Sequence, residues 1–157
     1  IVRGKYYPVK EDLTDLPSSL FCVTFTHNSK KINVVDFHGV WFPGSKKDTE
    51  ERLGQSQKVL DFLNTLEGEI ILCGDFNLGI DTRSILVFEK FGLINLIKEF
   101  KIEDTRGPIN KEIYGDKEYP LQRFADYTFV SKEINVKSFQ VPYVAISDHL
   151  PMILEFE

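Results

Sequence analysis

The sequence is short of cysteine and of long apolar runs, and both shortages narrow the class of protein. No apolar run approaches the roughly 20 residues of a membrane-spanning helix, and Lys5, Lys10 and Asp12 interrupt any signal-peptide core near the start. The two cysteines, Cys22 and Cys73, each lie within an apolar, strand-like run. We therefore expect two buried free thiols in a reducing, cytoplasmic environment, with a disulfide between them as the alternative.

Net positive charge is missing as well. Lysine and arginine number 19 against 24 aspartate and glutamate residues, which gives a formal net charge of −5. Proteins that bind long stretches of nucleic acid are more often basic, so the composition weighs slightly against a processive, sequence-independent nuclease. It leaves room for a local basic groove, although we interpret the pairs Lys30-Lys31 and Lys46-Lys47 as solvated loop charges.

The remaining composition is that of an ordinary globular domain. With 157 residues, the chain is long enough for one domain with a substantial hydrophobic core. It begins Ile-Val-Arg, without an initiator methionine, so we expect a processed or excised piece of a longer chain. Residues 1–19 mix prolines with charges and are expected to form a connecting segment, while 1–157 as a whole is expected to be a single, partial domain.

Hydrophobic patterning in the first half predicts strands on either side of a helix. The β-formers at residues 20–26 and 32–37 flank a polar turn and predict a hairpin, and the apolar run 69–73 predicts a further strand. A helix is expected to begin after Asp48 or Thr49, with an apolar stripe on one side. Gly68 is a favourable residue for ending a helix, so we expect that helix to end near Glu67.

The second half continues the alternation. A short helix is expected between Asp81 or Thr82 and about Lys90, followed by a short apolar segment at 93–100. Residues 103–123 are polar and contain two glycines and two prolines, so we expect a long loop whose basic residues could select the substrate. Strands are expected at 127–131, 136–141 and 152–156. Together these elements predict an α/β protein with a largely antiparallel or mixed sheet and helices outside it.

Polar side chains that could do chemistry stand at the ends or starts of the predicted strands. They are His38, Asp75, Asn77, Asp126, Asp148 and His149. Taken alone, each is explained at least as well as a turn former or a surface residue. Because neighbouring strands bring their ends to one rim of a sheet, we expect the set to gather there.

This set of side chains suits metal-assisted hydrolysis of a phosphoester. Phosphoryl transfer needs neutralised non-bridging oxygens, an oriented water and a stabilised leaving group. A Mg²⁺ ion held by hard carboxylate oxygens supplies Lewis acidity. An imidazolium can donate to a phosphate oxygen, and a carboxylate behind it fixes the tautomer and raises the pKa of the ring. An asparagine amide can hold a phosphate or a water without adding charge.

In chain order, the segments VVDFHG, IILCGDFN, ADYTFVS and SDHLP, with Arg52 and Gln55 between the first two, resemble the endonuclease/exonuclease/phosphatase superfamily. The resemblance runs from about residue 20 to the C-terminus. It implies the deoxyribonuclease I-like fold, a two-sheet β-sandwich flanked by helices, with Mg²⁺ or Mn²⁺ as the cofactor.

The resemblance also implies a role for each catalytic candidate. Asp75 would orient or deprotonate the attacking water, and Asn77 would hold the phosphate or that water. His149 would contact the scissile phosphate, with Asp126 behind its imidazole. His38 would be the second histidine of the site, as a phosphate contact or as the acid for the leaving oxygen.

The metal site implied by the resemblance consists of Asp148, Asp75 and Asn77. Arg52 and Gln55, by contrast, would be structural residues that tie the predicted helix to neighbouring loops. Both assignments follow from the family pattern.

Two features of the family pattern are missing. Members carry an early strand that ends in Asn, followed by a Gln-Glu pair whose Glu is the principal metal ligand; residues 1–19 contain neither, and Glu11 and Glu50 lie in the wrong context. We therefore expect an N-terminally truncated domain with reduced affinity for Mg²⁺. We also expect that an upstream segment or a partner chain completes the sheet.

Two functions of different classes follow. The leading hypothesis is a divalent-metal-dependent phosphoesterase that hydrolyses a phosphodiester, as a nuclease does, or a phosphomonoester, with nucleic acid as the first substrate class to test. The alternative is a non-catalytic remnant that binds a partner or needs the upstream chain for activity. A binding scaffold has no need of Asp75, Asp126 and His149 together, which favours the enzyme.

Overall fold

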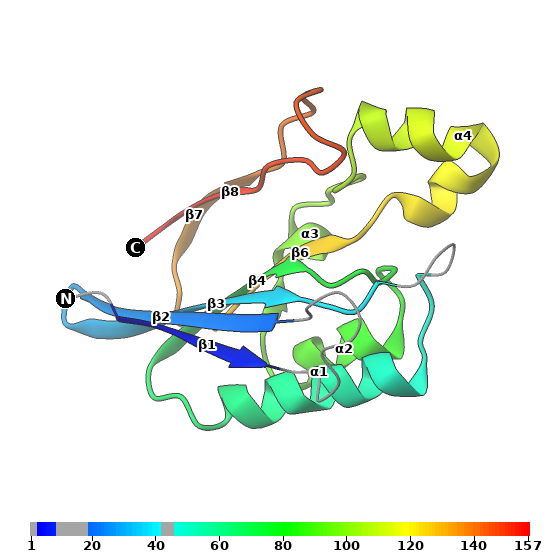
Figure 1. The fold of residues 1–157 in the computed structure, drawn as a ribbon. Helices are drawn as coiled ribbons and strands as arrows, with labels where there is room; N and C mark the ends of the chain where they lie inside the picture. The colour runs from blue at the N-terminus through cyan, green and yellow to red at the C-terminus, as the bar shows by residue number, and fades with distance from the viewer. Residues whose placement is uncertain (1–2, 9–18, 42–45) are drawn as a thin grey trace.

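The computed structural model describes residues 3–8, 19–41 and 46–157, and it shows two β-sheets with helices outside them. The elements in this part of the chain are β1 (Arg3–Pro8), β2 (Ser19–His27), β3 (Lys30–His38), α1 (Glu50–Leu63), β4 (Glu69–Asp75), α2 (Arg83–Lys90), β5 (Ile94–Asn95), α3 (Leu96–Glu99), α4 (Pro108–Gln122), β6 (Asp126–Val130), β7 (Val136–Gln140) and β8 (Ile153–Phe156). The larger sheet has the order β1-β2-β3-β4-β6-β5, and the smaller one pairs β7 with β8. Helices α1 and α2 lie on one side of the larger sheet and β7–β8 on the other (Figure 1). This confirms the predicted two-sheet sandwich with flanking helices.

The connections between strands decide which strand ends meet. Strands β2 and β3 form the predicted hairpin, and its turn residues Asn28 and Ser29 both have positive φ, as tight two-residue hairpin turns require. Strand β3 runs parallel to β4, with α1 as the crossover helix. Strand β4 is antiparallel to β6, so the end of β4 lies beside the start of β6, with Asp75 directly opposite Asp126.

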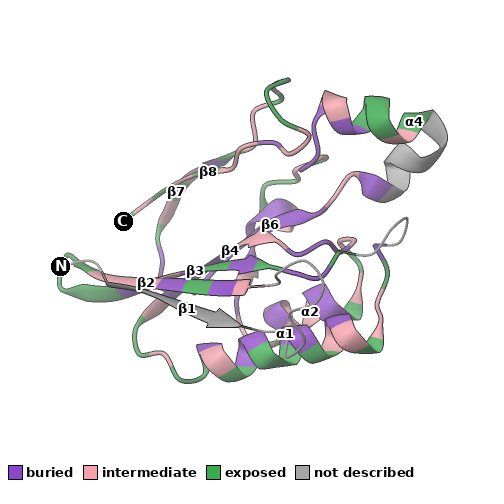
Figure 2. Ribbon diagram, in the orientation of Figure 1, coloured by how far each residue is buried: buried purple, intermediate pink, exposed green. Residues whose placement is uncertain are grey.

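Buried residues lie along β6 and on helices α1 and α2 (Figure 2). Every residue of β6 is buried. The strand lies between β4 and β5 in the larger sheet, and both faces of the sheet are covered there. Both cysteines are free thiols, as predicted, but only Cys22 is buried, while Cys73 is half-buried. Desolvation raises the pKa of both thiols, that of Cys73 to about 11. The thiols therefore behave as core side chains rather than as nucleophiles.

Helix α1 is fixed at its start to the loop that follows β3. Thr49 is its N-cap and accepts a hydrogen bond from the Arg52 backbone N–H, as predicted. The guanidinium of buried Arg52 donates to the carbonyl of Lys47, and the Gln55 side chain accepts from the Val40 N–H at 3.0 Å. The two side chains tie the helix to its neighbouring loop.

Two segments after β3 differ from the prediction. Helix α1 ends at Leu63, four residues before Glu67, and Gly68 instead supplies a φ of +96° in the turn before β4. Residues 103–123 are not a long loop: Pro108 opens helix α4, where its missing N–H costs nothing, and Gly115 takes a φ of +68° at a kink. Composition suggested a loop because proline and glycine usually interrupt helices. Here Pro108 takes the first helical position and Gly115 lies at the kink.

The N-terminal segment also contains regular structure. Residues 3–8, expected to belong to a connecting segment, form β1 along β2, with Arg3 opposite Thr24 and Pro8 opposite Ser19. Residues 9–18, including Glu11, lie outside the described residues. Within the described part of the chain, no helix combines the length and apolar character needed to cross a membrane.

Candidate active site

The loop after β4 is built around a buried aromatic side chain. Phe76 is 1% exposed and its ring packs edge-on against Phe37, Phe88 and Tyr127 at centroid distances of 5.0, 5.6 and 5.4 Å. Such ring pairs add stabilisation beyond the burial itself. Because Phe76 fills the core, the polar residues on either side of it are held at a fixed place at the strand end.

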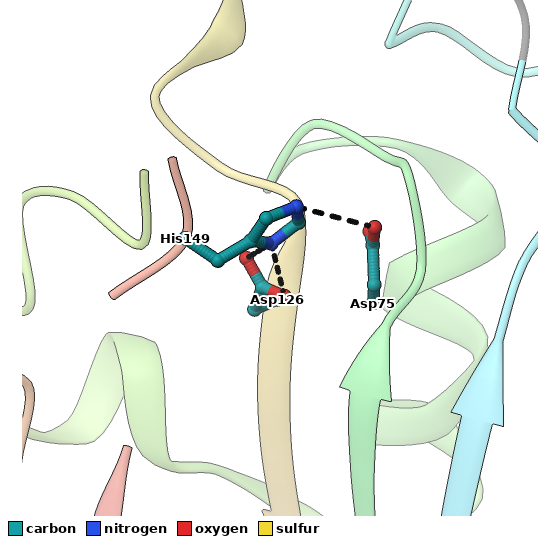
Figure 3. A group of neighbouring side chains, drawn as sticks. All are labelled: Asp75, Asp126 and His149. Carbon is teal, nitrogen blue, oxygen red and sulfur yellow. Dashed lines mark hydrogen bonds and ion pairs between the residues drawn. The ribbon is translucent and has the colours of Figure 1, made fainter. Parts of the chain in front are cut away.

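Backbone constraints shape the same loop. Gly74 has a φ of +125°, and a Cβ there would lie 2.2 Å from the Phe37 carbonyl oxygen, so no other residue fits. Asp75 Oδ1 accepts from the Asn77 backbone N–H at 2.9 Å, and Asn77 takes a positive φ of 55°, which asparagine tolerates. The second carboxylate oxygen of Asp75 faces His149 (Figure 3).

Asp126 opens β6 and is held by a threonine that the sequence analysis did not single out. The side chain of Thr105, which is fully buried, accepts hydrogen bonds from the backbone N–H groups of Ala125 and Asp126 at 3.0 and 3.2 Å. The Thr105 carbonyl in turn accepts from the Leu150 N–H at 3.0 Å. One residue thus fastens both the start of β6 and the segment that carries His149.

His149 stands between the two carboxylates. Its Nδ1 lies 2.9 Å from both oxygens of Asp126, and its Nε2 lies 3.8 Å from Asp75 Oδ2 (Figure 3). The hydrogen bond to Asp126 raises the pKa of His149, although burial opposes this. Burial raises the pKa of Asp126, and the hydrogen bond from His149 opposes that shift. In this pair, the proton on His149 Nδ1 points at the Asp126 carboxylate.

Asp148, predicted as a metal ligand, is paired with an arginine. Arg106 Nη2 donates to Asp148 Oδ2 at 2.6 Å, and Arg106 Nη1 donates to His149 Nε2 at 2.9 Å. Because a guanidinium only donates, Nε2 is the acceptor here and the ring proton is on Nδ1. The sequence analysis placed Arg106 in a segment that could select the substrate; the structure places it against the histidine ring.

Asn77 is engaged by a buried lysine. Lys46 is 8% exposed, and its ammonium donates to Asn77 Oδ1 at 2.8 Å, while Asn77 Nδ2 donates to the Gly39 carbonyl at 3.2 Å. Burial lowers the pKa of Lys46 to about 8, and the nearby charges of Asp75 and Asp126 counteract part of the shift. The interpretation of Lys46 as a solvated loop charge is therefore wrong.

His38 lies at the end of β3 and is exposed. The register pairs Asp36 with Cys73, so His38 and Asp75 follow on neighbouring strands and on the same face of the sheet. No hydrogen bond or ion pair joins His38 to the cluster among the described residues. The role of His38 as a phosphate contact or as the acid for the leaving oxygen therefore stays a prediction. The residue lies at the exposed edge of the cluster rather than within it.

A divalent cation is compatible with part of this arrangement. Asp75, Asp126 and His149 each offer one ligand atom, all within 4.8 Å of one another. Carboxylate oxygens suit Mg²⁺ and Mn²⁺, so the two aspartates are the fitting donors. The side-chain oxygens of Asn77 and Asp148, the other expected ligands, already accept hydrogen bonds from buried cations, so their role as ligands stays a prediction.

Comparison with solved structures supports the same fold. A functionally unknown conserved protein from Enterococcus faecalis matches 99% of this chain with a TM-score of 0.74 at 16% identity, over 67% of its own length. A mannosyl-6-phosphatase from Bacteroides thetaiotaomicron matches 99% with a TM-score of 0.71 at 17% identity, over 66% of its length. D. rerio TDP2, in complex with a single-strand DNA product, matches 99% with a TM-score of 0.68 at 15% identity, over 68% of its length.

The sequence itself decides the family. No curated protein matches it. The model of the Endonuclease/Exonuclease/phosphatase family, however, matches residues 6–149, which include every residue of the cluster around His149. This chain therefore belongs to the endonuclease/exonuclease/phosphatase family.

Proposed function

We propose that this protein hydrolyses phosphoesters with a divalent metal ion as cofactor. The observation that carries the proposal is the position of His149, whose Nδ1 is 2.9 Å from Asp126 and whose Nε2 is 3.8 Å from Asp75. The two acids occupy opposed positions on β4 and β6, while the histidine comes from a separate loop. Family membership supports the same reaction class.

The chemistry follows from the two sides of the imidazole. Asp126 holds the Nδ1 proton and favours the charged ring, which would donate from Nε2 to a phosphoryl oxygen. Asp75, on the opposite side, would accept the proton of the attacking water. A divalent ion, when bound, supplies Lewis acidity at the phosphoryl group.

The other candidates support these groups. Asn77 fixes one oxygen of Asp75 through its backbone N–H, which leaves the other oxygen directed at the site. Lys46 places a positive charge beside Asn77, where it would offset the charge of a phosphate. His38, exposed at the rim, would protonate the leaving oxygen from outside the central cluster.

The substrate is proposed only as a class. The relatives include a phosphatase and a protein in complex with a DNA product, so both phosphomonoesters and phosphodiesters are to be tested. Nucleic acid remains the first natural substrate class to test. We propose these activities for the protein that contains this chain, since the chain spans about two thirds of the length of the solved structures above.

The test is metal-dependent turnover of two generic probes, nitrophenyl phosphate and bis-nitrophenyl phosphate, with Mn²⁺ and with Mg²⁺. Asp75→Asn keeps the shape of the side chain but removes the charge, and it should abolish turnover of the probe that the wild type hydrolyses. Asp61→Asn, on the exposed side of α1, is the matched control and should leave turnover unchanged.

Two outcomes would contradict the proposal. One is an absence of metal-dependent turnover of either probe by folded protein, which would favour the non-catalytic alternative. The other is turnover that survives Asp75→Asn, because the chemistry would then lie elsewhere.

A further inference from the structure

Arg106 is a buried arginine whose guanidinium lies against the nitrogen of His149 that faces away from Asp126. The residue is 7% exposed and forms an isolated β-bridge with His149. Nη2 is held twice, by Asp148 Oδ2 at 2.6 Å and by Asn110 Oδ1 at 2.9 Å. Nη1 ends on His149 Nε2 at 2.9 Å. Nη2 is therefore anchored by Asp148 and Asn110, and Nη1 donates to the imidazole proposed to be catalytic.

Asn110 shows that the anchor is a built feature. It lies one helical turn after Arg106 in the sequence, at the start of α4, and is fully buried. Its Nδ2 has no hydrogen-bond partner among the described residues, and a buried donor left unpaired costs about 1–3 kcal/mol. This unpaired donor lies beside the buried guanidinium of Arg106, to which Asn110 Oδ1 is hydrogen-bonded at 2.9 Å.

The hydrogen-bond roles at His149 Nε2 indicate what Nη1 of Arg106 can do when substrate is bound. With Arg106 donating to it, Nε2 cannot at the same time donate to a phosphoryl oxygen. Both groups can act on substrate together only if an anion accepts from Nη1 and from the Nε2 proton. A phosphoryl group provides several such oxygens, and a guanidinium fork matches two of them.

The charges around the ring point the same way. Three carboxylates lie near His149: Asp75, Asp126 and Asp148, with Asp148 Oδ2 3.7 Å from Nε2. An anion entering this place would be repelled without a cation directed at it. Arg106 is the buried cation in contact with the ring.

We propose that Arg106 binds the phosphoryl group of the substrate: phosphate oxygens replace His149 Nε2 as the acceptor of the Nη1 hydrogens, while Asp148 and Asn110 keep Nη2 in place. The inference rests on the proposed phosphoesterase function for its kinetic test. It also predicts that the protein binds inorganic phosphate through Arg106, whether or not it turns a substrate over.

Kinetics and inhibition by inorganic phosphate test the proposal. Arg106→Gln should raise both KM and the inhibition constant of phosphate by about 10- to 100-fold, with a smaller change in kcat. Arg106→Lys keeps the charge but not the two-pronged guanidinium. Its KM and its inhibition constant for phosphate should lie between those of the wild type and those of Arg106→Gln. Arg83→Gln is the matched control, because Arg83 is exposed at the start of α2, a helix that carries no residue of the cluster; both constants should stay at wild-type values.

A merely structural role gives a different result. If Arg106 only positions His149, Arg106→Gln lowers kcat and leaves the inhibition constant of phosphate unchanged, which would overturn the proposal. If Arg106→Gln fails to fold, the guanidinium NMR signals of the wild-type protein decide. The Arg106 signals, assigned with Arg106→Lys, should move as inorganic phosphate is added, and signals unmoved at saturating phosphate would overturn the proposal.

The phosphoesterase proposal and the Arg106 proposal fail separately. Wild-type protein that binds phosphate through Arg106 but shows no turnover contradicts only the enzyme proposal. Turnover that depends on Asp75 but is indifferent to Arg106→Gln contradicts only the phosphate-binding role.

Discussion

Replacing Lys46 by methionine should stabilise the protein at pH 7 while weakening its activity. Burial lowers the pKa of Lys46 from 10.5 to about 8, and at about 1.4 kcal/mol per pKa unit the charged ammonium costs the folded state about 3 kcal/mol at neutral pH. Methionine has a similar length and no charge, but it leaves Asn77 Oδ1 without its donor, a loss of about 1–2 kcal/mol. The expected net gain is about 1–2 kcal/mol, or a few degrees in Tm.

The pH dependence of this gain has a definite sign. The folded-state pKa of Lys46 lies below that of the unfolded chain, so between about pH 8 and pH 10.5 the unfolded state binds more protons. The contribution of Lys46 to wild-type stability should therefore rise with pH across this window. Methionine does not titrate, so the advantage of Lys46→Met should be largest at pH 7 and disappear toward pH 10.

Urea unfolding at pH 7, 8, 9 and 10 measures the effect, with EDTA present so that no divalent ion binds near Asn77. Lys132→Met, at an exposed lysine outside the site, is the matched control and should show no pH-dependent difference from wild type. A Lys46→Met protein that is less stable than wild type by the same amount at every pH would refute the reasoning.

Three further predictions concern the loop after β4 and its partners. Phe76→Ala should destabilise the protein by about 3–5 kcal/mol in urea unfolding and abolish activity, because the ring is 1% exposed and packs against other aromatic rings; a loss below 1 kcal/mol would contradict this. Asp126→Asn should lower the pKa of His149 in an NMR titration, because the hydrogen bond that His149 donates to Asp126 is the main cause of its raised value. The raised pKa means that His149 stabilises the fold below its unfolded-state pKa, and that this stabilisation is lost as pH rises through the folded-state pKa. In Asp126→Asn this pH-dependent stabilisation should be smaller. Gly74→Ala should destabilise by about 2–4 kcal/mol in thermal unfolding, since its Cβ would lie 2.2 Å from the Phe37 carbonyl oxygen; wild-type stability would show that the turn relaxes.

The strands and the central residues of the site could be predicted because their signals are local. An apolar run followed by Gly-Asp-Phe-Asn marks a strand end whatever surrounds it, and the same holds for Asp126 before its strand. Their convergence follows from adjacent strands in one sheet. The register that places Asp75 opposite Asp126 confirms that part of the expectation.

The two cations of the site could not be predicted in the same way. Lys46 reaches Asn77 from 31 positions earlier, and a lysine pair in a polar segment looks the same whether one member is buried or both are solvated. Arg106 contacts His149 across 43 positions. Such contacts depend on how loops cross the sheet ends, which periodicity does not encode. Helix α4 was missed for another reason: Pro108 and Gly115 suggest a loop unless their helix positions are known.

The buried ring of Phe76 also has a dynamic consequence. Its backbone N–H donates to the Ala125 carbonyl at 2.8 Å, so the residue between Asp75 and Asn77 is joined both to the hydrophobic interior and to the segment that leads into β6. Opening this loop requires withdrawing an aromatic side chain from the interior, which links local opening to unfolding of the whole domain. Amide hydrogen exchange at Phe76 should thus be among the slowest in the molecule, and the loop that carries Asp75 and Asn77 should behave as a rigid support for the candidate site.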